Sequence, residues 1–331
     1  MKVLVIAEAG VNHNGSMELA QELVLKAALA GADFVKFQTF IPKNLVSTVA
    51  RKAKYQQENT CGSDSQLEML QQLVLPQSYH NALIECCRQN EIRFLSTPFD
   101  LESIDFLKKF EMPLWKVPSG EITNYPYLVE IAKTGKEIIL STGMSNLEEI
   151  RRAVSLLTIN GCGKITLLHC NTEYPTPFED VNLNAMLTLK REFGVDIGYS
   201  DHTVGIEVPI AAAAMGATVI EKHFTLDKNM EGPDHKASLE PNELQAMIHA
   251  IRNIELAMGD GVKEPSPSEQ KNINIARKSI VAKCHIECGE TLTIDNITTK
   301  RPGNGVSSML WPKVLGTKAI KDFDEDELIE L

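Results

Sequence analysis

Short apolar segments recur along the first two thirds of the chain, and most are followed by a segment with helical periodicity. Valine, isoleucine, leucine and phenylalanine dominate the short segments, a composition and length typical of buried strands. We therefore expect eight strands, at residues 3–8, 34–38, 93–97, 114–117, 138–142, 165–169, 196–200 and 219–223.

The segments between these strands repeat apolar residues every three or four positions, as in Leu19, Leu23 and Ala27. This spacing indicates amphipathic helices. Helices are expected at residues 17–29, 101–110, 147–157, 185–193 and 242–258. Eight strands alternating with helices predict an α/β fold of the (β/α)8 TIM-barrel type, with a doubly wound open sheet as the alternative.

The position of polar residues favours the barrel. Because side chains alternate along a strand, Lys36 and Gln38 share one face while Val35 and Phe37 share the other. Polar residues at the strand ends would then ring the carboxyl-terminal mouth of a barrel, where barrel enzymes keep their chemistry. These residues are Glu8, Lys36, Gln38, Thr97, Lys116, Ser141, His169, Ser200, His202 and His223.

The alternation of predicted strands and helices ends near Gly259, and the composition of the chain changes there. The Pro- and Ser-containing segment 264–268 has the composition of a linker. We therefore predict a catalytic barrel over 1–262, a linker over 263–278 and a small domain over 279–331. A unit of about fifty residues is marginal alone, so we expect it to dock on the barrel or on another subunit.

Charge and cysteine content narrow the function classes. The net charge is −11, from 33 Lys and Arg against 44 Asp and Glu, which argues against nucleic-acid and anionic-membrane partners. A local group of cations can still bind an anionic substrate. The seven cysteines include no C-x-x-C pair, and no apolar run has membrane-spanning length. We expect a soluble cytoplasmic protein with reduced thiols.

Two histidines at neighbouring strand ends are candidate metal ligands. His202 follows the seventh predicted strand and His223 ends the eighth, and adjacent strands lie about 5 Å apart. Both imidazoles could reach one divalent ion, and histidine with oxygen ligands suits Mn²⁺, Zn²⁺, Fe²⁺ or Co²⁺. For His13 and His169, a structural hydrogen-bonding role is as plausible as a ligand role.

Two lysines predict an anion site at the same mouth. An inward lysine is costly unless it is paired, so Lys36 and Lys116 should meet phosphate or carboxylate. The hydroxyls of Thr97, Ser119, Ser141 and Ser200 would complete a pocket for an oxygen-rich ligand. Glu8 and Glu121 could orient water or move protons, and Asp234 and His235 lie on the loop after the eighth strand. The chain has no P-loop, dinucleotide fingerprint or nucleophile elbow.

Ten motifs in order resemble the bacterial sialic acid synthase family, which includes N-acetylneuraminate and legionaminate synthases, and the segment after the linker resembles its antifreeze-like SAF domain. They are AEAGVNHNG at 7–15, KFQ at 36–38, STPF at 96–99, PSGE at 118–121, STGM at 141–144, LHCNTEYPTP at 168–177, YSDHT at 199–203, EKHF at 221–224, GPDHKAS at 232–238 and KRPGNG at 300–305.

The resemblance implies condensation of phosphoenolpyruvate with an amino-sugar of the N-acetylmannosamine type, with release of phosphate. It implies His202 and His223 as ligands of a divalent metal, which this family generally takes as Mn²⁺. It also implies Arg301 reaching the barrel of a partner in a domain-swapped homodimer. Phosphoenolpyruvate would be bound by Lys36, Thr97, Lys116, Ser119, Ser141 and Ser200. The sugar would be bound by Gln38, Asn59, Asn171, Tyr174 and Asp234. Proton and water steps would use Glu8, Glu121 and Lys116.

Some members of the family carry Thr-Asn where this chain has Asn171-Thr172. Two other functions stay open. Another phosphoenolpyruvate-dependent or aldolase-type barrel would need a basic cluster for a second phosphate. A non-catalytic sugar-binding protein would not need paired histidines beside two carboxylates. Within the family, the sugar is N-acetylmannosamine or its 6-deoxy-2,4-diacetamido analogue.

Overall fold

The computed structural model describes residues 2–60 and 65–331. The chain forms two compact units, Met1–Gly259 and Asp260–Leu331, and each is treated separately below. No helix in these described residues is both long enough and apolar enough to cross a membrane.

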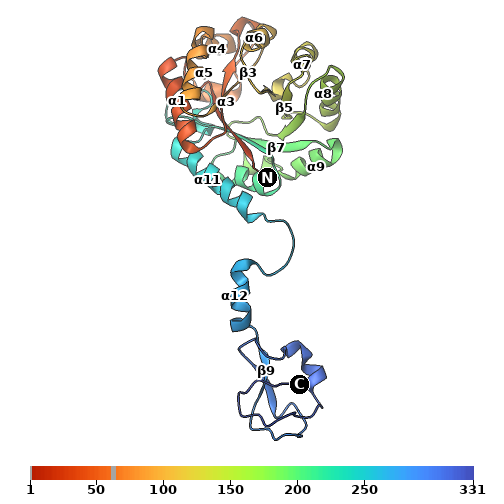
Figure 1. Cartoon of the computed structure of the whole chain (residues 1–331). Helices are drawn as coiled ribbons and strands as arrows, with labels where there is room; N and C mark the ends of the chain where they lie inside the picture. Colours follow the sequence, from red (N-terminus) through yellow and green to blue (C-terminus); the bar gives the residue numbers. More distant parts are fainter. Residues whose placement is uncertain (1, 61–64) are drawn as a thin grey trace. The chain divides into compact units, whose positions relative to one another are not determined.

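The first unit contains eight parallel strands that follow one another around a sheet (Figure 1). Hydrogen-bonded neighbours run in the order β3-β2-β1-β8-β7-β6-β5-β4, so the first strand pairs with the last. The two end strands, β3 and β4, also contact each other, so the sheet forms a nearly closed barrel and the expected TIM-barrel fold is confirmed. The strands are β1 Leu4–Gly10, β2 Phe34–Thr39, β3 Arg93–Pro98, β4 Leu114–Val117, β5 Glu137–Ser141, β6 Ile165–His169, β7 Asp196–Asp201 and β8 Val219–His223.

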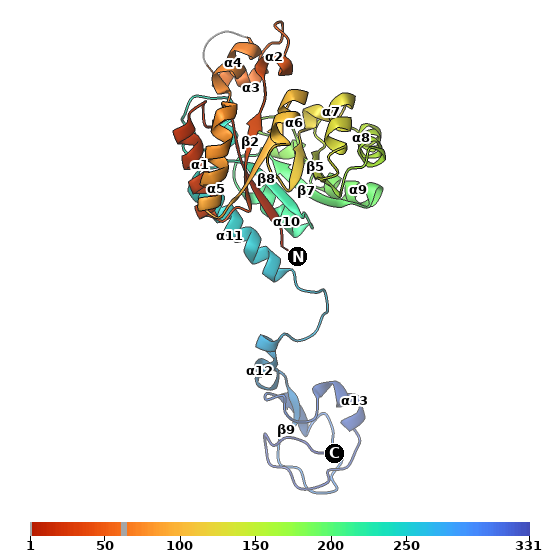
Figure 2. The ribbon, with the colours of Figure 1, turned by 45° about the horizontal axis from the view of Figure 1, so that its top comes forward.

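Helices surround the strands on the outside of this barrel (Figure 2). The main ones are α1 Met17–Ala30, α5 His80–Gln89, α6 Leu101–Leu107, α7 Tyr125–Ala132, α8 Leu147–Ile159, α9 Asn184–Phe193, α10 Glu207–Ala214 and α11 Pro241–Ala257. The helix expected over 101–110 ends at Leu107, earlier than predicted. Three shorter helices lie between β2 and α5, namely α2 Pro42–Leu45, α3 Lys54–Asn59 and α4 Gln66–Leu73. Short 3-10 turns occur at Gln77–Tyr79, Ser119–Glu121, Phe178–Asp180 and His235–Ala237.

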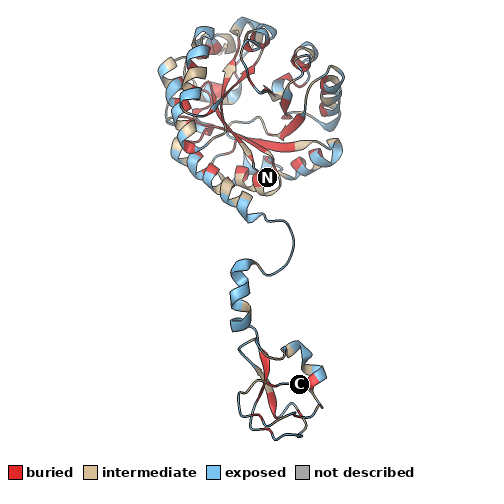
Figure 3. Ribbon diagram, viewed as in Figure 1, coloured by how far each residue is buried: buried red, intermediate tan, exposed pale blue. Residues whose placement is uncertain are grey.

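The hydrophobic core lies between the strands and the helices, so the strands are buried while the outer helix faces are exposed (Figure 3). Its largest members include Trp115, Tyr127 and Phe34, all fully buried. Apolar side chains therefore point outward from the barrel, and this arrangement leaves the inner face for polar residues.

An ion-pair group links the start of β1 to α11. Asp33 accepts hydrogen bonds from Lys2 and from the backbone amide of Val5, and it pairs with Arg252 at 2.8 Å. Burial alone would raise the pKa of Asp33, but these hydrogen bonds and the charge of Arg252 hold the pKa below its ordinary value of 3.8. Asp33 is therefore ionised in the folded protein.

The second unit contains α12 Pro267–Ala276, the antiparallel pair β9 Ser279–Ala282 and β10 Ile297–Lys300, a 3-10 turn at Ser308–Leu310 and α13 Trp311–Val314. Buried aliphatic residues and Phe323 form its own small core. The predicted linker thus contains a helix, because Ser266 and Glu269 form a capping box at its start. Two donors from the following domain reach the end of α12: Gly303 N bonds Asn274 O at 2.7 Å, and Arg301 Nε bonds Ala276 O at 3.0 Å.

Candidate active site

A cavity of about 180 Å³ lies inside the barrel at the carboxyl ends of the strands. Among the residues predicted for the site, those in its lining are Glu8, Lys36, Gln38, Thr97, Lys116, Ser119, Ser141, Tyr174, Ser200, His202 and His223. Side chains from strands on opposite sides of the sheet thus meet in one place, as expected if the barrel is closed.

Two lysines and two carboxylates form a buried chain of charges across the floor of this cavity. Lys36 Nζ lies 2.6 Å from Glu8 Oε2 and 3.8 Å from Glu221 Oε2. Lys116 Nζ lies 3.4 Å from Glu221 Oε1. All four side chains are at most 5% exposed. The two cations are therefore paired with two protein carboxylates.

The pKa values follow from this chain. Burial alone would raise the pKa of Glu221, but Lys116 and Lys36 outweigh burial and lower the pKa to about 2. Burial opposes the charge of Lys36, yet Glu221 and Glu8 raise the pKa of Lys36 above its ordinary value. Burial lowers the pKa of Lys116, for which Glu221 is the one close carboxylate in the described part of the chain. Glu221 therefore stays ionised, and it acts as the shared counter-charge of both lysines.

Hydroxyl groups occupy the spaces between these charges. Lys36 Nζ donates to Thr97 Oγ1 at 3.0 Å, and Lys116 Nζ donates to Ser141 Oγ at 2.8 Å. Ser200 Oγ donates to Glu221 Oε1 at 2.8 Å. The floor of the cavity is thus a continuous polar surface that could accept a phosphate or carboxylate group.

The two predicted histidine ligands lie side by side, with ring centroids 5.3 Å apart. His202 Nδ1 hydrogen-bonds the carbonyl oxygen of Asn171, which can only accept, so Nδ1 carries the proton and Nε2 keeps its lone pair. His223 Nδ1 is buried and has no hydrogen-bond partner among the described residues. Burial lowers the pKa of His202 to about 4 and that of His223 well below its ordinary value, so both rings are neutral.

Neutral imidazoles with free lone pairs are suitable ligands for a divalent metal, and a backbone carbonyl fixing the far nitrogen is a usual feature of such ligands. Across residues 2–60 and 65–331, no group of three or more His, Cys, Asp or Glu side chains is arranged to hold a metal ion. Among these residues, the donors available to a divalent metal in the cavity are therefore the nitrogens of His202 and His223.

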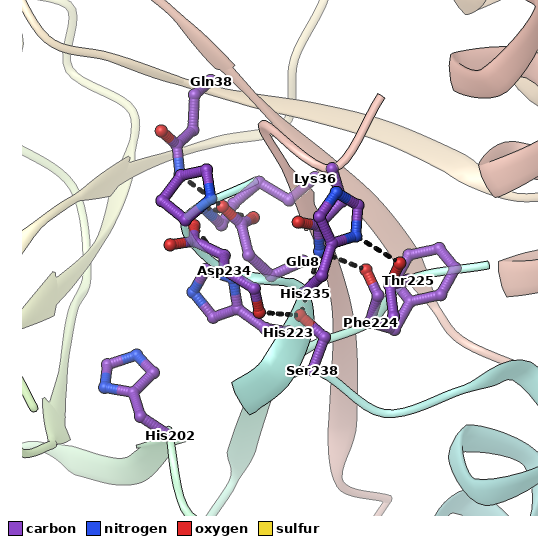
Figure 4. Close-up of polar contacts among 12 residues, drawn as sticks. Glu8, Lys36, Gln38, His202, His223, Phe224, Thr225, Asp234, His235 and Ser238 are labelled. Atoms are coloured by element: carbon purple, nitrogen blue, oxygen red, sulfur yellow. Dashed lines mark hydrogen bonds and ion pairs between the residues drawn. The ribbon is translucent and has the colours of Figure 1, made fainter. Parts of the chain in front are cut away.

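Asp234 lies above His223 on the loop between β8 and α11 (Figure 4). Its Oδ2 is 3.7 Å from His223 Nδ1, and burial together with Glu8 raises the pKa of Asp234 to about 7. Asn12 and Ser238 hold this loop, because Asn12 Nδ2 donates to Ser238 Oγ at 2.9 Å and Ser238 Oγ donates to Asp234 O at 2.7 Å. Asn59 Nδ2 also bonds this loop, at Pro233 O, 3.1 Å away.

Five predicted site residues lie outside the cavity lining: Asn59 and Asp234, described above, and Glu121, Asn171 and Arg301. Glu121 is on the 3-10 turn after β4, where Asn124 donates to its carboxylate and burial raises its pKa. Asn171 offers its carbonyl to His202, and its side chain accepts from the amide of Glu173. Arg301 belongs to the second unit.

Histidines 13 and 169 have structural hydrogen bonds. His13 Nδ1 accepts from Gly15 N at 3.0 Å, and His169 Nε2 donates to Val181 O at 2.8 Å. These contacts favour the structural interpretation of both.

The structure also adds residues to the cavity that were not assigned from the sequence. Glu221 shares a strand face with His223, so alternation along the strand was a usable signal for it. Phe99, Met144, Cys170 and Thr172 come from loops or loop-proximal positions whose side-chain directions have no periodic signal. Tyr55 stacks on Tyr174 at 5.2 Å, and Tyr174 stacks on His202 at 4.1 Å, so an inserted helix also braces the site.

This fold and this site are typical of a (β/α)8-barrel enzyme, with paired lysines, hydroxyls and imidazoles lining one cavity at the carboxyl ends of the strands. Comparison with known proteins agrees. Residues 23–263 match the sequence profile of the NeuB family, and residues 277–330 match that of the SAF domain. The chain belongs to the NeuB family.

Its relatives include characterised synthases. It is 58% identical to the N,N'-diacetyllegionaminic acid synthase of Campylobacter jejuni, over 99% of each chain. It is 44% identical to the enzyme of that name from Legionella pneumophila, over 96% of this chain and 90% of the other. It is also similar to the crystal structure of an N-acetylneuraminic acid synthetase from Leptospira borgpetersenii, with a TM-score of 0.73 and 34% identity. The match spans 82% of this chain and 90% of the other. The resemblance and the synthase function predicted from the sequence are confirmed.

Proposed function

We propose that this enzyme condenses phosphoenolpyruvate with the 6-deoxy-2,4-diacetamido analogue of N-acetylmannosamine, releases phosphate and forms a legionaminate. The choice of sugar is supported by the identities of 58% and 44% to legionaminic acid synthases, against 34% to the N-acetylneuraminic acid synthetase. The observation that carries the proposal is the buried pair of lysines that share Glu221.

Phosphoenolpyruvate would bind over the floor of the cavity. Its phosphate and carboxylate are anions, and Lys36 and Lys116 are fixed cations backed by the hydroxyls of Thr97 and Ser141. Ser119 and Ser200 would supply further hydrogen bonds to the same ligand. Preorganised charges of this kind stabilise developing charge without reorganising during the reaction.

The sugar would bind at the outer part of the cavity, near the histidines. We assign His202 and His223 as ligands of a divalent metal, for which we propose Mn²⁺; when bound, this ion would polarise the aldehyde of the open-chain sugar. Tyr174 would stack beside it. Additional sugar contacts are assigned to Gln38, Asn59, Asn171 and Asp234.

The bonds change in a defined order. The terminal carbon of phosphoenolpyruvate attacks the aldehyde carbon, water adds to the resulting cationic centre, and the tetrahedral intermediate loses phosphate by C–O cleavage. Glu8 lines the cavity, and Gln38 Nε2 donates to its Oε1 at 3.0 Å. Because its carboxylate lies within the cavity, Glu8 is our first choice for the residue that transfers a proton. Glu121 is the second candidate, and it would need to reach the cavity when substrate is bound.

We further propose a homodimer in which the SAF domain of one chain brings Arg301 to the barrel of its partner. A guanidinium group suits sugar hydroxyl and acetamido oxygens, because it offers several donors in a fixed plane. The six cysteines of the described residues are all free, which supports the cytoplasm as the site of action.

The substrate is tested by incubating the full chain with Mn²⁺, phosphoenolpyruvate and each candidate sugar, and measuring phosphate release. We expect rapid release with the diacetamido sugar, slower release with N-acetylmannosamine, and none with His202→Ala or in EDTA. Preference for a phosphorylated sugar would contradict the proposal and favour another class of phosphoenolpyruvate-dependent barrel. Full activity after removal of all divalent metal would contradict the metal assignment.

A further inference from the structure

A lysine and an aspartate form a fully buried ion pair outside the cavity, on the outer face of β7 and β8. Asp201 and Lys222 are register partners on these neighbouring strands, with Nζ 2.5 Å from Oδ2 and both side chains 0% exposed. Because side chains alternate along a strand, Lys222 points away from the cavity that Glu221 and His223 line. The pair thus lies in the layer between the sheet and the helices, which is otherwise mainly apolar.

Stability alone does not account for two ions in this layer. Desolvation offsets much of the attraction between buried charges, and replacing such a pair by apolar residues of similar volume is often neutral or stabilising. The geometry of the pair suggests another role. Lys222 Nζ also donates to Thr203 O at 2.5 Å. The Asp201 carboxylate accepts from Thr203 N at 3.1 Å and from Thr203 Oγ1 at 3.0 Å.

These contacts fix the residues on both sides of His202. Strand β7 ends at Asp201, so His202 lies just beyond the last residue of the strand. Its carbonyl accepts from Thr176 N at 2.9 Å, and its Nδ1 donates to Asn171 O. His223, in contrast, is itself a residue of β8 and is held by the strand. His202 therefore depends on contacts of its own backbone and ring, and on those of its two neighbours, for the position that His223 obtains from the sheet.

We infer that Lys222 and Asp201 are positioning residues that hold the imidazole of His202 beside His223, with Nε2 directed to the divalent metal. This inference rests on the proposed metal site. The ion pair acts through the backbone: Lys222 fixes Asp201, the residue before His202, and both ions bind Thr203, the residue after it. The histidines supply the nitrogen atoms that would bind the metal. The ion pair on the opposite face of the sheet would fix the position of the His202 ring.

The test uses the near-isosteric double variant Asp201→Asn/Lys222→Met in the full chain, which leaves no unpaired charge in the core. We would measure Mn²⁺ affinity of the metal-free protein by calorimetry, the visible absorption of the Co²⁺-loaded protein, and the urea midpoint. The matched control is Asp196→Asn/Lys164→Met, which removes an exposed ion pair of 2.5 Å at the other end of β7.

We expect the Mn²⁺ dissociation constant of the Asp201/Lys222 variant to rise about 10- to 100-fold, as for other changes behind a metal ligand. Its Co²⁺ spectrum should change because ligand geometry changes, while the control keeps wild-type affinity and spectrum. A purely structural pair would lower only the urea midpoint and leave Mn²⁺ affinity of the folded protein unchanged, and this result would overturn the inference.

Two further variants keep the test decisive. If the double variant does not fold, Thr203→Val retains the ion pair and removes only the hydroxyl contacts, and we expect about fivefold weaker Mn²⁺ binding; wild-type affinity would overturn the inference. His202→Ala separates the two proposals. Weak binding in His202→Ala with wild-type affinity in the Asp201/Lys222 variant would overturn the positioning role alone. Wild-type affinity in His202→Ala would overturn the metal site and the positioning role together.

Discussion

Replacing Lys36 by Met should destabilise the ligand-free enzyme more than the same change at Lys116. Lys36 Nζ faces carboxylate oxygens at 2.6 and 3.8 Å, whereas Lys116 Nζ faces one at 3.4 Å. With an effective dielectric constant near 20, Coulomb's law gives about 6 and about 4 kcal/mol for the Lys36 contacts and about 5 kcal/mol for the Lys116 contact. The attraction lost at Lys36 is thus roughly twice that lost at Lys116.

The absolute loss is smaller than these sums, because Met does not carry the desolvation cost of Lys. Removing one partner of a buried pair costs about 3–5 kcal/mol, since the other charge is left unpaired. Among the described residues, Lys36→Met leaves Glu8 with the hydrogen bond from Gln38 alone, and the change should cost about 4 kcal/mol. In Lys116→Met, Glu221 keeps Lys36 and Ser200, so a loss of about 2 kcal/mol is expected.

The assay is urea unfolding of substrate-free protein, followed by far-UV circular dichroism. Lys54→Met is the control, because its side chain is 88% exposed and should change stability by no more than about 0.5 kcal/mol. If Lys36→Met were as stable as the wild type, or if Lys116→Met lost more stability than Lys36→Met, the ion pairing assigned to these lysines would be wrong. In calorimetry, both core variants should bind phosphoenolpyruvate about a hundredfold more weakly. A variant with reduced sugar affinity and normal phosphoenolpyruvate affinity would refute the assignment of that lysine.

Three further outcomes are expected. Mixing inactive His202→Ala with inactive Arg301→Ala, under conditions of subunit exchange, should restore part of the phosphate release if the site is shared between subunits; a mixture that stays inactive excludes the swapped dimer. Asp33→Asn should cost about 1–2 kcal/mol at pH 7. Because the folded-state pKa of Asp33 is lowered, this stabilisation is present above about pH 4 and is lost as the pH falls, so the two urea midpoints should converge in acid. Gly198→Ala should cost about 2 kcal/mol, because its Cβ would lie 2.3 Å from Val219 O, whereas Gly120→Ala meets nothing within 4 Å and should unfold at the wild-type midpoint.

The barrel and much of its mouth were predictable because strand structure is periodic. Alternation places Lys36 and Gln38 on the inner face, and the strand bounds differ from the expected ones by a residue or two. The same rule could have identified Glu221, although not its role between two lysines, because that role depends on which strands lie opposite one another. Pairing across the barrel is a tertiary property and has no local signature.

Loop residues were the least predictable part of the site. The bond from Asn12 to Ser238 joins residues 226 positions apart, and the stacking of Tyr55 on Tyr174 depends on an inserted helix. The helix α12 was assigned to a linker because its Pro and Ser residues are common in linkers. The same residues also begin helices, with Ser266 as the cap and Pro267 in the first turn.

The attachment of the 300–305 loop to α12 determines where the SAF domain can be cut from the chain. A fragment beginning at residue 279 would retain β9 and β10 but lose the carbonyl acceptors of Asn274 and Ala276. Gly303 and Arg301 would then lose these two contacts, although Ser279 would still bond Pro302 O and Gly305 N in the same loop. A fragment beginning before Ser266 keeps the helix, its cap and the loop together, so it is the smallest piece expected to present Arg301 in its native conformation.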